Sequence, residues 1–595
     1  MEMSLIRRIA AAALALLASA PAAFSDVVIA ERGRPRALIV VPPEAQEAEL
    51  YAAEELALHL RAVTGGVFEI IHGAGAGNTS GRLLVGPAAA RLADPAFDVS
   101  RLAPEEVIVR ASGSDLILAG GSPRGTLYAV YTFLEEVVGC RWWTRTANHV
   151  PWRPTLKIGA TAIRFKPPLE YREPYWYVAF DPAWAARNKA NGSLAGGDER
   201  RGGRQIYEGF VHTFYPLIPP GVYFKDHPEW FSEIGGTRRS EGAQLCLSNE
   251  EMRRELVKNL KARLRANPRA TIASVSQNDC QGACACARCR AVDEEEGSPA
   301  GSLLRFVNAV AQDIEVEFPD VAIDTLAYQY TRKPPRFVRP LPNVIVRLCS
   351  IECSFSRPLD HLKNKAFFDD LEGWSRIAGR LYIWDYTTDF AHYVQPHPNY
   401  PVLAPNIRLF AGRNVRGIFE QGAYQSWGSE MAEMRAWVLA KLLWNPTLDP
   451  GKLRREFLRG YFGPAAGSIA EYLDILETAV LAADDPLGCY SPPQARFLSL
   501  DTLEKSWAVL QKAERKARPI AEYVRRVRLA KLPIAYVVLA KWDALREEAA
   551  ARGRHWPWAP RRGDLLAWFL DAARAEGVTM ISEGQTLDDW AAKNK

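Results

Sequence analysis

The sequence lacks the features that mark a nucleic-acid binder, a nucleotide-dependent enzyme or an integral membrane protein. Its net charge is only +5 over 595 residues and no basic stripe is present, so nucleic acid is not an expected partner. The glycine-rich segment GGSPRG at 120–125 has neither the GxGxxG pattern nor the lysine of a phosphate-binding loop. Beyond the N-terminus no apolar run is long enough for a transmembrane helix. No cofactor is therefore expected.

The N-terminal residues have the pattern of a targeting segment. Arg7 and Arg8 form a basic region, and residues 9–20 form an apolar region too short to span a bilayer comfortably. Residues 23–25 (AFS) offer small side chains at the usual cleavage spacing. The pattern predicts a signal peptide over 1–25 and an exported, periplasmic or extracellular protein with no stable membrane insertion after cleavage. An uncleaved anchor is the alternative.

Apolar and aromatic residues are abundant. The chain is 48% hydrophobic and contains 17 Trp and 21 Tyr, enough for a sizeable core in two or three domains. Aromatic rings suit the apolar faces of sugars, and they also fill large cores. Residues 26–160 predict a small α/β domain, with amphipathic helices at 49–63 and 124–138 and a β-hairpin at 107–119.

Strand-like and helix-like segments alternate over residues 161–445. The strand-like segments are 170–180, 210–215, 244–247, 271–276, 322–328, 344–351, 380–384 and 415–419. The amphipathic segments between and after them are 250–265, 302–318, 360–377, 404–413 and 429–444. Eight such units in under 300 residues predict a central (β/α)₈ TIM-like barrel.

Residues 446–595 have helical periodicity throughout. The segments are 452–461, 465–481, 501–517, 520–547 and 564–576. The predicted fold class is α/β, with a small N-terminal α/β domain, a central barrel and a C-terminal α-helical domain.

Acidic residues follow several of the predicted barrel strands. Asp279 follows the fourth strand, Glu352 the sixth and Asp385 the seventh. Barrel enzymes keep their chemistry at the carboxyl ends of the strands. Hydrolysis of a glycosidic bond needs two carboxyl groups, one protonated and one ionised. We therefore predict that Asp279, Glu352 and Asp385 are catalytic, although any of them could instead be a capping or salt-bridging carboxylate.

Other polar and aromatic residues at the same strand ends are candidates for binding a sugar. They are Arg172, His212, Asn278, Tyr328, Trp384 and Glu420. Arg172 is a possible partner for a uronate carboxylate. His212 and Trp384 could equally be structural, and Glu420 could simply pair with Arg416.

Four of the nine cysteines cluster just after Asp279, namely Cys280, Cys284, Cys286 and Cys289. The spacing is compact enough to chelate zinc, but it lacks the two separated knuckles of typical structural zinc sites. Export favours two short disulfides that fix the loop after the fourth strand, and no metal is expected. Cys140, Cys246 and Cys489 have no obvious partner in the sequence.

Several motifs give the chain a family resemblance. They are ELALHLRAVTGG, LLVGP, RGTLYAVYTFLEEVVGCRWW, HPEWF, QLCLSN, SQND with the following cysteines, LAYQYTRKPP, IEC, IWDYTTDF and AKLLWNP. They resemble the exported bacterial proteins that carry domain of unknown function 4838. The N-terminal part is similar to the non-catalytic domain that precedes the barrel in family 67 α-glucuronidases and in N-acetylhexosaminidases.

The resemblance implies a glycoside hydrolase barrel followed by a helical region. In family 67 the acid lies after strand four and further carboxylates lie after strands six and seven. Asp279, Glu352 and Asp385 match these places by strand order, and the acid would be Asp279 where the family has Glu. The hexosaminidases use an adjacent Asp-Glu pair, which Asn278-Asp279 is not.

The sequence thus predicts an exported, exo-acting glycoside hydrolase with a carbohydrate substrate, a uronic acid or an amino sugar being possible. Two alternatives stay open. One is a substrate-assisted N-acetylhexosaminidase. The other is a glycan-binding protein on a non-catalytic barrel. The sequence does not determine the oligomeric state.

Overall fold

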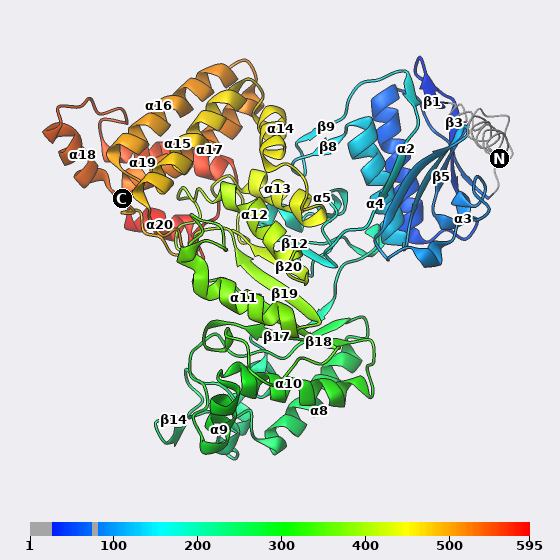
Figure 1. The fold of residues 1–595 in the computed structure, drawn as a ribbon. Coiled ribbons are helices and arrows are strands. Elements are labelled where there is room, and N and C mark those ends of the chain that lie inside the picture. Colours follow the sequence, from blue (N-terminus) through cyan, green and yellow to red (C-terminus); the bar gives the residue numbers. More distant parts are fainter. Residues whose placement is uncertain (1–25, 74–80, 595) are drawn as a thin grey trace, which may run out of the picture. The chain divides into compact units, whose positions relative to one another are not determined.

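The computed structural model describes residues 26–73 and 81–594. The predicted signal peptide over 1–25 lies outside these residues. Two compact units make up the described chain (Figure 1). The first consists mainly of residues up to Arg141 together with His149–Lys166, and the second mainly of residues from Gly203 onward together with Pro167–Asp198. Within the described ranges, no helix combines the length and apolar character needed to cross a membrane. The predicted domain boundaries at 160 and 445 stay predictions.

The first unit contains a six-stranded mixed sheet with strand order β11-β6-β7-β5-β3-β4. Helix α2 begins at a Gln46–Glu49 capping box and ends at Gly65, whose φ of 83° is left-handed. The predicted hairpin is the antiparallel pair β6–β7. The elements of this sheet are β3 (Ala37–Val41), β4 (Ile70–His72), β5 (Gly81–Val85), β6 (Val107–Ser112), β7 (Asp115–Gly120) and β11 (Ala162–Phe165), with helices α2 (Glu47–Thr64), α3 (Pro87–Ala90) and α4 (Pro123–Thr132). A smaller sheet contains β1 (Val27–Glu31), β2 (Arg34–Pro35) and β10 (Leu156–Ile158), and β8 (Arg141–Trp142) pairs with β9 (Asn148–His149).

The second unit is built on a seven-stranded, wholly parallel sheet with strand order β12-β20-β19-β18-β17-β16-β13. Its strands are β12 (Tyr171–Tyr175), β13 (Tyr207–Glu208), β16 (Ile272–Ser274), β17 (Ala322–Ala327), β18 (Val344–Cys349), β19 (Arg380–Tyr386) and β20 (Val415–Gln421). Side chains from all seven strands meet in one cluster, so the sheet is curled around them. The mixed α/β class is confirmed, with a half-barrel of seven described strands.

Two of the eight predicted barrel strands differ from the structure. The second is only Tyr207–Glu208, and part of the predicted segment 210–215 starts the short helix α6 (Phe214–Leu217). The third, 244–247, is a loop with one isolated bridge between Leu245 and Phe231. β13 therefore pairs directly with β16.

Helices cover the outside of the sheet and continue to the C-terminus. Asn249 caps α8, and α8 packs with α10 beside β17 (Figure 1). The helices that accompany the sheet are α5 (Pro182–Arg187), α7 (Pro220–Tyr223), α8 (Glu250–Ala266), α9 (Ala287–Glu296), α10 (Ala300–Glu315), α11 (Lys365–Ile377), α12 (Tyr400–Ala411) and α13 (Ala432–Trp444). A small hairpin joins β14 (Glu233–Ile234) and β15 (Thr237–Arg238).

The C-terminal segment is mostly helical, as predicted, but it also contains a hairpin. Its helices are α14 (Pro450–Phe462), α15 (Ala466–Ala483), α16 (Leu500–Ala517), α17 (Ala521–Ala540), α18 (Trp542–Ala551), α19 (Arg562–Ala575) and α20 (Leu587–Lys593). The hairpin consists of β21 (Met580–Ser582) and β22 (Gln585–Thr586). The turn of this hairpin carries Glu583, which lines a pocket at the curled sheet.

Candidate active site

A pocket of about 270 Å³ opens at the carboxyl ends of the curled sheet. Residues from the loops after several strands line it, together with residues from the C-terminal segment. The lining residues are Val211, His212, Asp279, Leu326, Tyr328, Cys349, Ile351, Trp384, Tyr386, Phe390, Gln421, Tyr424, Tyr490 and Glu583. The pocket therefore contains four of the predicted site residues, namely His212, Asp279, Tyr328 and Trp384.

Asp279 is held by hydrogen bonds in the loop after β16. The Tyr328 hydroxyl donates to Asp279 Oδ1 at 3.1 Å, and Gln329 Nε2 donates to the same hydroxyl at 2.8 Å. Burial, together with the charge of Asp279, raises the pKa of Tyr328, which keeps this phenol a proton donor. Tyr328, in the loop after β17, thus orients the carboxyl group of Asp279.

Gln277 joins the loops around Asp279. Its side chain donates to the Tyr328 carbonyl at 3.1 Å and accepts from the Thr331 hydroxyl at 2.5 Å. Its backbone carbonyl lies 2.8 Å from His212 Nδ1. His212 has φ of 54°, an uncommon conformation for a residue other than glycine. These contacts fix His212 and Tyr328 relative to Asp279.

The second carboxyl group in the pocket belongs to Glu583, which the sequence analysis missed. Glu583 lies in the two-residue turn between β21 and β22. Its Oε1 accepts a hydrogen bond from the Tyr424 hydroxyl at 2.9 Å. Tyr490 lines the same pocket as both carboxyl groups. Burial, and then the charges of nearby groups that include Glu583 and Asp279, raise the pKa of Tyr490. The Glu583-Gly584 pair is a turn signal, but nothing in the sequence places that turn beside the barrel.

Aromatic rings form much of the pocket wall. Trp384 and Tyr386 project from β19 with their rings stacked at a centroid distance of 6.2 Å. Trp384 Nε1 donates to Gln421 Oε1 at 2.8 Å, which fixes the indole plane. Tyr386 packs edge-on against Phe390 at 6.0 Å. Such a wall presents flat apolar faces beside two carboxyl groups.

Glu352 and Asp385, the other two predicted catalytic residues, do not line this pocket. Glu352 has 42% of its side chain exposed and forms an ion pair with Arg332 at 2.9 Å. Asp385 is buried and accepts from the Ser350 hydroxyl at 2.5 Å. Successive strand residues face opposite sides, so Asp385 points away from the interior that Trp384 and Tyr386 face.

Glu420 is buried with Asp385 behind the pocket wall. The two residues are paired neighbours on β20 and β19. Burial raises the pKa of Asp385 to about 6, and burial together with the charge of Asp385 raises the pKa of Glu420 well above its usual value. Glu420 is therefore the carboxyl group of the pair that keeps its proton.

Arg172 and Asn278 are also directed into the scaffold. Arg172 donates to the backbone carbonyls of Lys189 and Leu169 and lies over the Trp444 ring. Asn278 donates to the Ala243 carbonyl at 2.9 Å and accepts from the Tyr215 amide. Neither side chain lines the pocket.

The predicted disulfides are absent from the described residues, where all nine cysteines are free thiols. The sulfurs that gather belong to Cys284, Cys286, Cys289 and the distant Cys246. Cys280 is outside this group, and its thiol donates instead to the Ala243 carbonyl at 3.4 Å.

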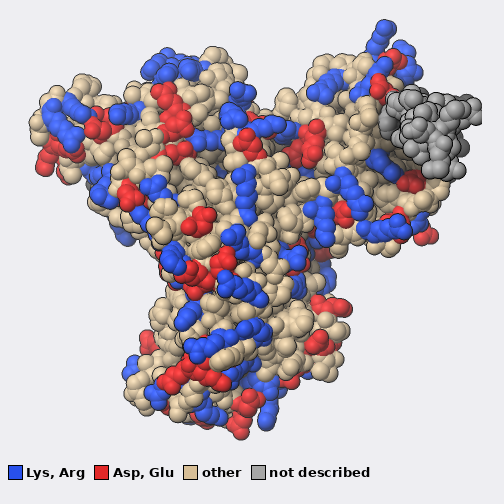
Figure 2. All heavy atoms as spheres, viewed as in Figure 1, with Lys and Arg blue, Asp and Glu red and all other residues tan. Residues whose placement is uncertain are grey.

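Charge on the molecular surface is mixed. On the face drawn in Figure 2, Lys and Arg side chains are interspersed with Asp and Glu, and neither sign forms a continuous field. That face offers no basic stripe for a nucleic acid.

The second unit is thus a curled parallel sheet with carboxyl groups and aromatic rings at the carboxyl ends of its strands. The sequence matches the family described as "Domain of unknown function (DUF4838)" over residues 142–474. This match covers more than half of the chain, so the chain belongs to that family. No curated protein matches the sequence.

The chain is similar to several solved structures at 10–11% identity. One is the structure of a novel family GH115 4-O-methyl-α-glucuronidase, BtGH115A, with specificity for decorated arabinogalactans. Its TM-score is 0.60 at 11% identity, covering 93% of this chain and 77% of that chain. CpGH84D has a TM-score of 0.46 at 11% identity, covering 93% and 97%. A GH138 enzyme targeting pectin rhamnogalacturonan II has a TM-score of 0.41 at 10% identity, covering 94% and 98%. The first of these structures shares its fold with this chain.

Proposed function

We propose that the protein is a glycoside hydrolase that acts outside the cytoplasm and cleaves its substrate in the pocket lined by Asp279 and Glu583. The observation that carries the proposal is the meeting of these two carboxyl groups, over 300 positions apart in the sequence, in one aromatic-walled pocket. Two carboxyl groups on either side of a glycosidic bond are what acid-base hydrolysis requires. The glycosidase-like fold supports the same class of reaction.

The two carboxyl groups have comparable surroundings. Each accepts one phenol hydrogen bond, from Tyr328 in one case and Tyr424 in the other. In both cases the phenol contacts a single oxygen, so the second oxygen of each group can face a sugar. We assign proton donation to Asp279, at the end of a barrel strand, and the ionised role to Glu583, which would activate water or attack the anomeric carbon.

The lining of the pocket favours a neutral sugar or an amino sugar over a uronic acid. No Arg or Lys is among the residues that line it, and two carboxyl groups are. A uronate would be repelled by these groups and would find only His212 as a possible cation. Arg172, the predicted partner for a uronate, is held behind the wall by the Lys189 and Leu169 carbonyls.

The proposal is tested with a panel of aryl glycosides and natural oligosaccharides. Asp279→Asn and Glu583→Gln are each expected to lower kcat/KM by about 10²–10⁴-fold on the substrate that the wild type cleaves. The loss in Asp279→Asn should be smaller for a dinitrophenyl leaving group, which needs no protonation. Glu583→Gln should lose activity on both leaving groups.

The Glu352→Gln variant distinguishes the proposed pair of carboxyl groups in the pocket from the assignment by strand order, in which Glu352 is catalytic. Because Glu352 lies outside the pocket, its substitution is expected to change kcat/KM less than threefold. A large loss in Glu352→Gln with little loss in Glu583→Gln would contradict the proposed pair. Sugar binding by the wild type without turnover of any substrate would favour the non-catalytic alternative, and strong inhibition by a thiazoline would favour a substrate-assisted hexosaminidase.

A further inference from the structure

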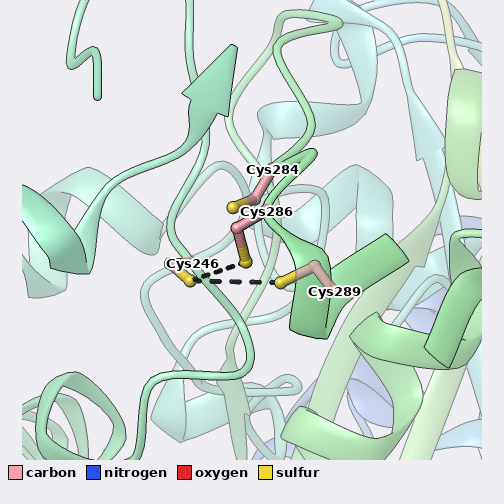
Figure 3. A group of neighbouring side chains, drawn as sticks. All are labelled: Cys246, Cys284, Cys286 and Cys289. Carbon is pink, nitrogen blue, oxygen red and sulfur yellow. Dashed lines mark hydrogen bonds between the residues drawn. The ribbon is translucent and has the colours of Figure 1, made fainter. Parts of the chain in front are cut away.

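Four cysteine sulfurs converge in the second unit from separate parts of the chain. Cys246 lies in the loop before α8, Cys284 and Cys286 lie in the loop before α9, and Cys289 lies in the first turn of α9 (Figure 3). Their four Sγ atoms all lie within 4.8 Å of one another. All four side chains are buried and form a cluster of their own.

The sulfur separations distinguish between a disulfide and a metal site. Sγ of Cys246 lies 3.8 Å from that of Cys286 and 4.0 Å from that of Cys289. A disulfide needs a separation of about 2.05 Å. Tetrahedral zinc bonded at about 2.3 Å to each sulfur separates the sulfurs by about 3.8 Å. We propose that Cys246, Cys284, Cys286 and Cys289 bind one zinc ion.

The surroundings suit the negative charge that such a site carries. Zinc with four thiolates has a net charge of −2, so donors around the sulfurs stabilise it. The Glu233 amide donates to Cys284 Sγ at 3.4 Å, and Arg238 Nη1 donates to the same sulfur at 3.6 Å. The Ser248 hydroxyl lies 3.6 Å from Cys246 Sγ and 3.8 Å from Cys286 Sγ.

The N-terminus of helix α9 also stabilises negative charge at the cluster. Cys286 is the N-cap residue of α9, where backbone amides and the helix dipole favour negative charge. Binding converts four thiols to thiolates, so each zinc ion taken up releases four protons. The sulfur-metal bonds also remove the thiolates from oxidation, which explains how an exported chain can keep these cysteines unpaired.

The ion would tie the loop of Cys246 to the loop that carries Asp279, Cys284 and Cys286. Gln244, two residues before Cys246, donates to the carbonyls of Asn278 and Cys280 at 3.0 and 2.8 Å. Its Oε1 accepts from the Asn278 amide at 2.8 Å. The site is therefore structural, and it does not depend on the proposed hydrolase activity.

The test measures metal in the full chain purified after export without chelators. Elemental analysis is expected to give one zinc per chain. Cobalt added in place of zinc should show the intense sulfur-to-metal charge-transfer absorption of a tetrathiolate site. Cys246→Ser should lose the zinc and the absorption. Cys280→Ser is the matched control, because Cys280 adjoins the cluster without belonging to it, and it should retain one zinc.

Wild-type measurements keep the proposal testable if Cys246→Ser does not fold. Titration with an organomercurial should release one zinc per chain as four thiols react. Non-reduced peptide mapping should find the four cysteines without disulfides. A wild-type chain that binds neither zinc nor cobalt, disulfides within the four cysteines, or full metal retention by folded Cys246→Ser would each overturn the proposal.

Discussion

Asp385 and Glu420 show how burial changes the chemistry of single residues. Both are almost fully buried, and the carboxyl oxygens of Glu420 have no hydrogen-bond partner among the described residues. Two buried carboxylates side by side would repel each other, so the folded state prefers at least one proton on the pair. Their pKa values in the folded chain are consequently above those of the unfolded chain.

This pair predicts a loss of stability with rising pH. An acid whose pKa is raised by folding stabilises the folded state fully at a pH below its pKa in the unfolded chain, about 4. This stabilisation is lost as the pH rises through the pKa in the folded chain. For Asp385 the folded value is about 6. Glu420→Gln imitates the protonated form, so its stability relative to the wild type should be higher at pH 8 than at pH 5.

Thermal and urea unfolding at pH 5 and pH 8 measure this difference. The exposed Asp320 provides the matched control, since Asp320→Asn should show no such pH dependence. Equal effects of Glu420→Gln at the two pH values would contradict a raised pKa of Glu420 in the folded chain.

The sequence predicted which residues follow the strands but not which side they face. Trp384, Asp385 and Tyr386 are consecutive, and only the two aromatic residues line the pocket. A shift of one position along a strand turns a side chain to the opposite face, and strand ends cannot be located that accurately from a single sequence. Asp279 was predicted correctly as a pocket residue because it lies in the loop after a short buried strand, β16.

Among the strands, β17 and β18 are joined inside the curled sheet by a fully buried ion pair. Arg347 Nη2 and Nε lie 3.1 and 3.2 Å from Asp324 Oδ2, and both side chains are completely buried. The Tyr207 hydroxyl of β13 donates to Asp324 at 3.2 Å and accepts from Arg347. The pair thus connects the short strand β13 to the rest of the sheet.

Removal of one partner should destabilise the sheet strongly. Arg347→Met leaves Asp324 buried without its cation, and the expected loss in the free energy of unfolding is about 3–5 kcal/mol. The double variant Arg347→Met with Asp324→Leu should recover part of this loss, because no unpaired charge remains. Urea unfolding of both variants checks this, and a double variant less stable than Arg347→Met would contradict it.

Long amphipathic helices were predicted more accurately than short strands. The segment predicted as a helix at 250–265 is α8 at Glu250–Ala266, because an Asn cap and a regular apolar face mark its extent. The apolar run at 244–247 was predicted as a strand, yet its Gln244 side chain binds the loop at Asn278 and Cys280. A segment of four residues does not by itself distinguish a strand from a packed loop.

At the scale of the whole molecule, the C-terminal segment completes the pocket of the barrel. The Tyr393 amide donates to the Ile581 carbonyl at 2.8 Å, and the Glu583 amide donates to the Phe390 carbonyl at 2.7 Å. Trp590 of α20 packs near Tyr536 and Phe569 at ring distances of 5.4 and 5.2 Å, which anchors the segment behind the hairpin. Periodicity revealed the helices, but these contacts between distant segments leave no local pattern in the sequence.

The turn that carries Glu583 should therefore control activity through backbone geometry alone. Gly584 has φ of 82°, and a Cβ built there meets no atom within 4 Å. Gly584→Ala introduces only backbone strain, of about 1–2 kcal/mol, which the turn can relieve by moving Glu583. Since small displacements of reacting groups slow catalysis, kcat/KM should fall roughly tenfold or more.

Gly563 is the matched control for this substitution. It also has open space around its Cβ position, but it lies in α19 without a left-handed φ, so Gly563→Ala should leave kcat/KM unchanged. The comparison requires only steady-state kinetics and unfolding curves of two folded variants. If Gly584→Ala retained full activity despite a measurable loss of stability, the strain would not have moved Glu583, and the predicted control of activity by this turn would be wrong.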